Sequence, residues 1–75
     1  MSKEDEKVSD TKYVDGNLFL VNCIDGYGAE IEYQFDRLRL RRRYALPGYY
    51  KSTWFTDLDE VPEPARTLFK QRESA

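Results

Sequence analysis

Four arginines at alternate positions carry the clearest chemical signal in the sequence. They are Arg37, Arg39, Arg41 and Arg43. Alternate residues of a strand share one face, so the four guanidinium groups would form a row with a spacing of about 6.6 to 7 Å, while Leu38 and Leu40 face the other way. Each guanidinium offers a planar fork of donors that fits carboxylates and phosphates. The row predicts a site for an anionic partner.

Further basic and aromatic side chains follow within a few residues. The partner-binding candidates after the arginines are Tyr44, Tyr49, Tyr50, Lys51 and Trp54. Residues 37–56 hold six basic side chains and no acidic one, within a chain whose formal net charge is −2. Arginine beside exposed aromatic rings is typical of protein-interface hot spots and of sites for single-stranded nucleic acid. The segment therefore predicts a binding surface.

The overall charge balance helps to choose between these partner classes. With 12 basic and 14 acidic side chains, the chain as a whole repels a polyanion everywhere except at this segment. We therefore expect a larger protein with an acidic surface as partner, with RNA or single-stranded DNA as the alternative. A plainer interpretation stays open, in which the arginines form a solvated face that pairs with Glu30, Glu32 or the acidic N-terminal residues, and the aromatics build the core.

Residues able to perform catalysis are scarce. The chain has no histidine and one cysteine, which excludes the commonest general base and a tetrahedral zinc site of cysteine and histidine. Cys23 lies in an apolar run without a neighbouring base and reads as a core residue. Lys51 and Ser52 are adjacent, but adjacent strand residues point to opposite faces. We therefore do not expect these two residues to form a serine–lysine catalytic dyad. We expect a non-enzymatic adaptor or inhibitor with no cofactor.

The densest carboxylate cluster outside the N-terminal residues comprises Asp57, Asp59, Glu60 and Glu63. Its spacing lacks the glycine and terminal glutamate of a calcium loop. Acidic side chains cap helix N-termini and complement the helix dipole. We predict the start of a helix here rather than a metal site.

Length and composition limit the architecture. The chain of 75 residues and 8.9 kDa has room for one small domain. Residues 1–11 are charged and nearly free of apolar groups, so we predict a disordered tail there and a single domain over 12–75. A single cysteine, no long apolar segment and no signal-peptide pattern favour a cytoplasmic protein that does not enter a membrane.

Two runs of residues predict a β-hairpin. Residues 17–25 are rich in β-branched and aromatic side chains with apolar groups on both faces, which is typical of a central strand covered on two sides. Turn residues follow at 25–28. Residues 29–35 then alternate strictly between apolar and polar, as a half-buried strand does.

The alternation changes phase after residue 35. Ile31, Tyr33 and Phe35 are odd-numbered, whereas Leu38 and Leu40 are even-numbered. A strand that changes phase turns its core face to water, so we expect a bulge or sharp bend near residues 36–37. A helix over residues 29–43 competes with this interpretation because Ile31, Phe35 and Leu38 also fit helical spacing.

The C-terminal part predicts a turn, a strand and a helix. Pro47 and Gly48 suit the two central positions of a tight turn in which Gly48 takes positive φ, and residues 49–55 follow as a strand. Val61, Ala65, Leu68 and Phe69 then form an apolar stripe at helical spacing.

These elements predict an α+β domain, in which a small curled antiparallel sheet of three to five strands is closed by a short C-terminal helix. The order of bent strands, the Thr53 and Trp54 pair and a short terminal helix resembles chromodomain-like and other SH3-type small barrels. The resemblance covers about 50 residues and implies a fold only, because the chain lacks the aromatic pattern of a methyl-lysine cage. An unpaired edge or exposed aromatic patch leaves a homodimer open.

Overall fold

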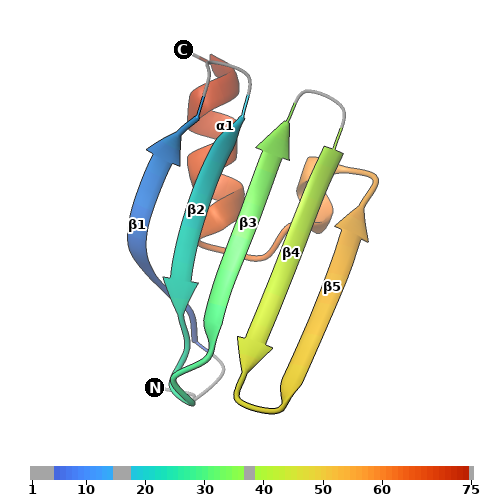
Figure 1. Ribbon diagram of the computed structural model, residues 1–75. Coiled ribbons are helices and arrows are strands. Elements are labelled where there is room, and N and C mark those ends of the chain that lie inside the picture. The colour runs from blue at the N-terminus through green and yellow to red at the C-terminus, as the bar shows by residue number, and fades with distance from the viewer. Residues whose placement is uncertain (1–4, 15–17, 37–38, 75) are drawn as a thin grey trace.

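A computed structural model describes residues 5–14, 18–36 and 39–74 of the chain. Residues 73 and 74 are described by their backbone alone. Five antiparallel strands lie side by side in chain order, with a 3₁₀ turn and one helix on a single face of the sheet (Figure 1). The elements are β1 (Lys7–Tyr13), β2 (Phe19–Ile24), β3 (Glu30–Asp36), β4 (Arg39–Leu46), β5 (Tyr49–Phe55), η1 (Leu58–Glu60) and α1 (Ala65–Ser74).

The predicted hairpin is formed by β2 and β3. Phe19 lies opposite Phe35 and Cys23 opposite Ile31, so the apolar positions of both strands share one face. In the turn between them, the Asp25 carboxylate accepts hydrogen bonds from the backbone N–H groups of Tyr27 (2.9 Å) and Ala29 (3.0 Å). The predicted turn between β4 and β5 is also confirmed, with Gly48 at φ 78°.

The change of phase after Phe35 is explained by a second hairpin. β3 ends at Asp36 and β4 begins at Arg39, and the two strands pair with Asp36 opposite Arg39 and Phe35 opposite Leu40. Odd-numbered residues of β3 therefore lie beside even-numbered residues of β4 on the same face. The bulge or sharp bend expected near residues 36–37 falls in part on residue 37, which lies outside the described residues, and two separate strands lie on either side of it. The competing helix over residues 29–43 is wrong for the described part of that range.

The core lies between the sheet and α1. Phe69 of α1 packs on Phe19, Tyr33 and Phe35, with ring centroids 5.8, 6.5 and 5.0 Å away. Ala65 and Val61 are buried in the same core. The predicted helical stripe is confirmed from Ala65 onward, whereas Val61 caps η1 and lies before α1. Aromatic rings thus supply much of the apolar burial that a chain of this length needs.

The sheet does not close into a barrel. β1 pairs with β2 and β5 pairs with β4, and the described strands β1 and β5 form opposite edges of one open sheet (Figure 1). The part of the prediction that holds is the antiparallel sheet with a C-terminal helix; the SH3-like barrel is not supported. β2 is also covered on one face only, because Ile24 remains 45% exposed on the other.

The N-terminal boundary differs from the prediction. Residues 7–11, which the composition assigns to a disordered tail, form most of β1, and residues 1–4 of that tail lie outside the described part. All seven β1 side chains are exposed, so the strand is held mainly by its backbone ladder with β2. One ring contact adds to the ladder, between Tyr13 and Phe19 at 4.8 Å. Amino-acid composition predicts how much apolar surface a segment can bury. It does not predict the backbone hydrogen bonds by which β1 pairs with β2.

Within the described ranges, no helix is both long enough and apolar enough to cross a membrane.

Candidate partner-binding face

The face of the sheet away from α1, here called the open face, carries three of the four predicted arginines. Arg39, Arg41 and Arg43, here called the arginine ridge, alternate along β4 with Leu40, which packs on the core. Arg37 lies outside the described residues. The local alternation therefore positions the ridge, because the core positions of β4 leave the odd-numbered residues on the open face.

The ridge lies between an acidic strand and an aromatic strand. On β3, Asp36, Gln34 and Glu32 lie opposite Arg39, Arg41 and Arg43 in turn. On β5, Trp54 lies opposite Arg41 and Ser52 lies opposite Arg43. Tyr50 lies two residues before Ser52, on the same face, opposite Ala45. Directly opposed residues share a face, so acidic, basic and aromatic side chains form three parallel stripes on the open face.

Arg41 contacts three side chains of β5, which are Ser52, Tyr50 and Trp54. Its Nε donates to Ser52 Oγ (2.8 Å) and its Nη2 to the Tyr50 hydroxyl (3.2 Å). Its Cζ lies 5.1 Å from the centroid of the Trp54 ring, and that of Arg39 lies 5.9 Å away. Cation–π contacts of this kind fix the guanidinium planes against the indole. Ser52 was not among the predicted site residues, and only the strand register reveals its place beside Arg41.

Arg43 connects the acidic and aromatic stripes. Its Nε donates to the Tyr50 hydroxyl (3.1 Å), and its Nη1 lies 3.5 Å from Glu32 Oε1 in an exposed ion pair. The hydrogen bond from Arg43, with a further contribution from Arg41, lowers the pKa of the Tyr50 phenol. The plainer interpretation, a solvated arginine face, predicted ion pairs with Glu32. Among the three described ridge arginines, Arg43 forms this ion pair.

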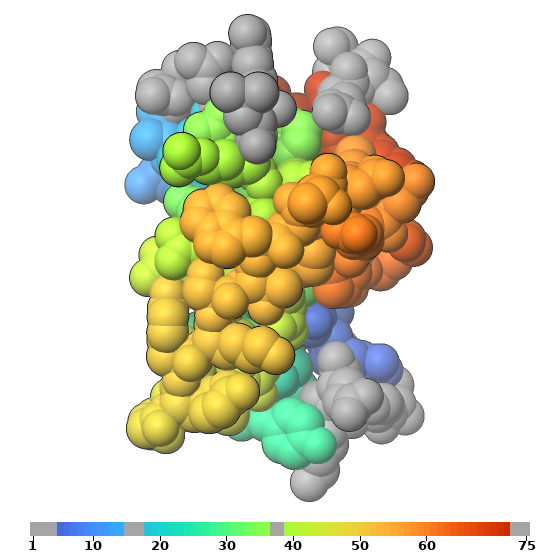
Figure 2. Space-filling model, turned by 90° about the vertical axis from the view of Figure 1, so that its right-hand side faces the viewer, coloured from blue at the N-terminus to red at the C-terminus, as the bar shows by residue number. Residues whose placement is uncertain are grey.

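Two aromatic side chains of the open face stay exposed despite these contacts. Trp54 is 56% and Tyr50 54% exposed. Figure 2 looks onto the β5 edge, where the yellow and orange side chains of residues 49–55 lie at the surface. β5 is an edge strand in the described sheet, so neither side chain is covered by a following strand.

Three of the predicted site residues lie on the other face. Tyr44, Tyr49 and Lys51 alternate with the open-face residues of β4 and β5, and the Tyr44 and Tyr49 rings pack edge to face at 5.9 Å. Burial and the nearby Asp25 carboxylate raise the pKa of Tyr44. The predicted set is therefore divided by the pleat, which brings together the described ridge, Tyr50 and Trp54.

Arg42, which sequence reasoning did not single out, belongs to a polar network on the helix side. Its Nε donates to the Tyr33 hydroxyl (3.0 Å) and its Nη2 lies 3.2 Å from Glu6 Oε2. The Tyr33 hydroxyl donates in turn to Glu6 Oε1. The Glu6 side chain is only 9% exposed, and the network joins the residue before β1 to the centre of the sheet.

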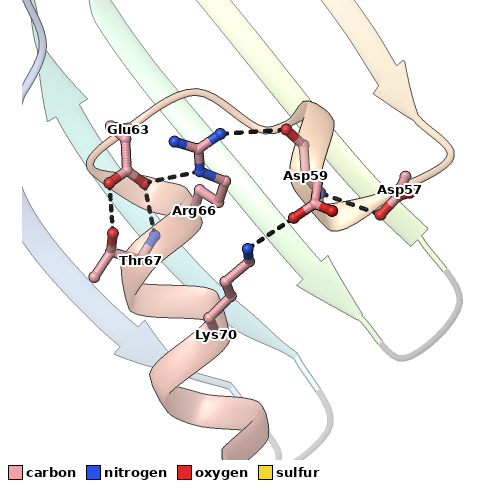
Figure 3. A network of polar contacts seen from close by, with 6 residues as sticks. All are labelled: Asp57, Asp59, Glu63, Arg66, Thr67 and Lys70. Carbon is pink, nitrogen blue, oxygen red and sulfur yellow. Dashed lines mark hydrogen bonds and ion pairs between the residues drawn. The ribbon is translucent and has the colours of Figure 1, made fainter.

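The carboxylate cluster at residues 57–63 stabilises the approach to α1 (Figure 3). Asp57 caps η1 by accepting from the Asp59 N–H (3.1 Å), Asp59 pairs with Lys70 Nζ (2.7 Å), and Glu63 accepts from the Thr67 N–H (2.9 Å). The side-chain hydrogen bonds from Lys70 and Thr67 lower the pKa of Asp59 and Glu63. Among the described residues, no group of three or more potential ligands is placed to hold a metal ion.

Comparisons of the chain with protein-family models, curated proteins and solved structures find no match. The case for the open face as a binding site therefore rests on its own geometry and charge.

Proposed function

We propose that the protein is a non-enzymatic binding module, a small adaptor or inhibitor, that docks an acidic surface of a larger protein on its open face. The observation that carries the proposal is the contact of Trp54 with both Arg39 and Arg41 while the indole remains 56% exposed. Arginine, tryptophan and tyrosine are the residues that most often dominate interface energetics. Arg39, Arg41, Arg43, Tyr50 and Trp54 would make the contacts.

The order of the ridge supports binding because it lowers the entropic cost of association. Arg41 is held by Ser52, Tyr50 and Trp54 before any partner arrives, so fewer rotamers are lost on docking. Two of its five N–H donors serve these hydrogen bonds. The remaining donors suit the two oxygens of a partner carboxylate, and the Trp54 ring beside them suits an apolar side chain.

The acidic stripe favours a protein over RNA or single-stranded DNA. Glu32 and Asp36 lie one strand away from the ridge, about 4.8 Å in the direction across the sheet. A phosphate backbone crossing the open face would meet these carboxylates, whereas a single carboxylate of a protein partner can contact the ridge alone. Nucleic acid remains the alternative because the Trp54 and Tyr50 rings could stack on bases.

Fluorescence anisotropy with two labelled probes tests the proposal. The probes are a peptide of aspartate and glutamate around a central phenylalanine, and a mixed-sequence single-stranded DNA, each at about 50 and about 200 mM salt. The test variant combines Arg39→Glu and Arg41→Glu. Lys51→Glu is the matched control, because it reverses a charge on an exposed residue of the opposite face of β5.

The peptide should bind the wild type and the Lys51→Glu control alike, and the ridge variant should bind it at least tenfold more weakly while keeping its circular dichroism spectrum. Equal peptide binding by the ridge variant would mean that the ridge is only a solvated face. Tighter binding of the DNA, with a steep loss at the higher salt and on Trp54→Ala, would instead establish the nucleic-acid alternative.

A further inference from the structure

The open face carries a pattern that is complementary to itself. Residues that pair across the sheet form rows running from β2 to β5. The three complete rows are Ile24, Glu30, Ala45 and Tyr50; Asn22, Glu32, Arg43 and Ser52; and Leu20, Gln34, Arg41 and Trp54. In two of the rows the β3 and β4 positions both hold polar or charged side chains, and in the third they hold Glu30 and Ala45. The outer positions hold matching types, aliphatic with aromatic or amide with hydroxyl.

We infer that a second copy of this chain docks on the open face, in a symmetric dimer whose two-fold axis runs parallel to the strands between β3 and β4. This inference rests on the binding role proposed for the same face and adds a second copy of the chain as an occupant besides the larger protein. Such an axis keeps each row at its level and reverses its order, so β3 of one copy faces β4 of the other. Glu32 then meets the partner's Arg43, and Asp36 meets the partner's Arg39.

The charges favour this packing over the other face-to-face arrangement. The Arg43 and Glu32 pair within one copy, 3.5 Å apart, would stack on the same pair reversed in the second copy. The four charges then alternate in sign around a square, so each cation has two neighbouring anions. A two-fold axis perpendicular to the strands would instead stack the ridge on the ridge, which like-charge repulsion disfavours.

The outer positions of each row fit the same axis. Trp54 faces the partner's Leu20, Tyr50 faces the partner's Ile24, and Ser52 faces the partner's Asn22. Trp54, Tyr50 and Ile24 are each about half exposed in the single chain, and the dimer would cover all three. Apolar anchors outside a polar centre would thus be buried on both sides of the interface, as an isologous contact requires.

The small size of the face is typical of weak, transient complexes. Four overlapping strands about 4.8 Å apart, each about seven residues of 3.3 Å long, give an interface at or below the ~800 Å² per partner of a standard complex. A dissociation constant on the order of 10 µM is therefore expected. Sedimentation velocity of the full chain from about 1 µM to about 500 µM covers this range.

Charge reversal at Glu32 separates the dimer from the wider binding role. Glu32→Lys places a cation opposite the partner's Arg43, so the dimer dissociation constant should rise at least tenfold. The same variant removes an anion beside the ridge, so it should bind the acidic peptide more tightly than the wild type. Adding Arg43→Glu to Glu32→Lys restores alternating charges and should restore the dimer. Glu60→Lys, a charge reversal outside the sheet, is the control and should leave both measurements unchanged.

Cysteine cross-linking tests the axis. A short bis-maleimide should link a mixture of Asn22→Cys and Ser52→Cys chains into a heterodimer, because these positions face each other across the roughly 10 Å between stacked sheets, which is too far for a direct disulfide. Asn22→Cys alone should not cross-link, because its two copies lie about three strand spacings, roughly 14 Å, apart. Cys23 is buried on the opposite face of β2 and does not compete.

A chain that stays monomeric to 500 µM, or that cross-links as Asn22→Cys alone, overturns the dimer. If the acidic peptide still binds the ridge in that case, the proposed binding role stands without the dimer. If the peptide fails to bind a monomeric chain, both are overturned.

Discussion

Neighbouring arginines of β4 have different environments, and this difference defines the site. Arg41 points to the open face and contacts Trp54, whereas Arg42 points to the helix side and pairs with Glu6 and Tyr33. The pleat alone separates them, because adjacent strand residues face opposite ways. The arginines of β4 therefore divide into two sets. Those of the ridge lie on the open face, and Arg42 stabilises the fold on the helix side.

Two ionisable groups on the helix side set the alkaline limit of stability. Burial, with a smaller contribution from the Glu6 carboxylate, raises the pKa of the Cys23 thiol from 9.0 to about 11. Burial also raises the pKa of the Tyr33 phenol, and its hydrogen bond to Glu6 adds to the shift. Both groups stay protonated in the folded chain at a pH at which they ionise in the unfolded chain.

The free energy of unfolding should therefore fall as pH rises above about 9. Between the unfolded and folded pKa values of Cys23, the unfolded chain binds fewer protons, and stability present below pH 9 is lost progressively toward pH 11. The thiol alone should remove about 1 kcal/mol by pH 10. Urea unfolding at pH 7, 8, 9 and 10 measures this.

The matched variant for this prediction is Cys23→Ala, which lacks the thiol. It should be less stable than the wild type at pH 7 and should lose less stability between pH 8 and pH 10. Equal losses in the two chains would show that the thiol does not ionise on unfolding in this range.

At the scale of the elements, α1 is the only described helix longer than one turn and covers one face of the sheet. Its contact with the sheet converges on Phe69, which is 1% exposed and packs on rings of β2 and β3. Thr67 and Lys70 attach α1 to the residues before it through Glu63 and Asp59. The ring packing supplies most of the stabilisation, because exposed ion pairs contribute little.

Phe69→Ala should therefore destabilise the protein by about 3 to 5 kcal/mol, through lost apolar burial and the cavity left among the rings. A domain of this size has only a few kcal/mol of stability, so the variant should be largely unfolded at 25 °C by circular dichroism. Lys70→Ala, the adjacent exposed residue, should unfold at nearly the wild-type urea concentration. A folded and stable Phe69→Ala chain would show that α1 is held elsewhere.

For the whole molecule, the N-terminal strand decides where the domain begins. β1 completes the sheet beside β2, and Glu6 joins its start to Arg42 and Tyr33. Without β1, β2 becomes an edge strand with Phe19, Val21 and Cys23 on its inner face. An edge of this composition is prone to pair with other chains.

A chain reduced to residues 12–75 should therefore lose at least about 2 kcal/mol of stability, because Arg42 and Tyr33 lose a buried partner along with the β1 ladder. It should also aggregate on heating. A chain of residues 5–75 is the control and should melt close to the full-length temperature. If both shortened chains melt alike, the domain begins at residue 12, as composition alone predicts.

The sequence by itself determined the elements whose cause is local. Strict alternation at residues 30–35, the glycine of the Pro47 and Gly48 turn, and the apolar stripe ending at Phe69 each reflect the period or φ of one segment, and the corresponding strand, turn and helix are present. The arginine alternation likewise placed Arg39, Arg41 and Arg43 on one face.

Only the tertiary structure decided which residues meet. β1 forms through backbone pairing with β2 and the contact of Tyr13 with Phe19, which the polar composition of residues 1–11 does not predict. Because β3 and β4 pair as a hairpin, the odd-numbered apolar residues of β3 share a face with the even-numbered Leu40 of β4. The same pairing places Glu32 and Asp36 beside the ridge. The sheet has two open edges instead of the expected barrel closure. Tyr50 and Trp54 lie on the open face, whereas Tyr44, Tyr49 and Lys51 lie on the opposite face. Each outcome depends on register between strands, which arises from hydrogen bonds and packing between distant segments rather than from any single segment's pattern.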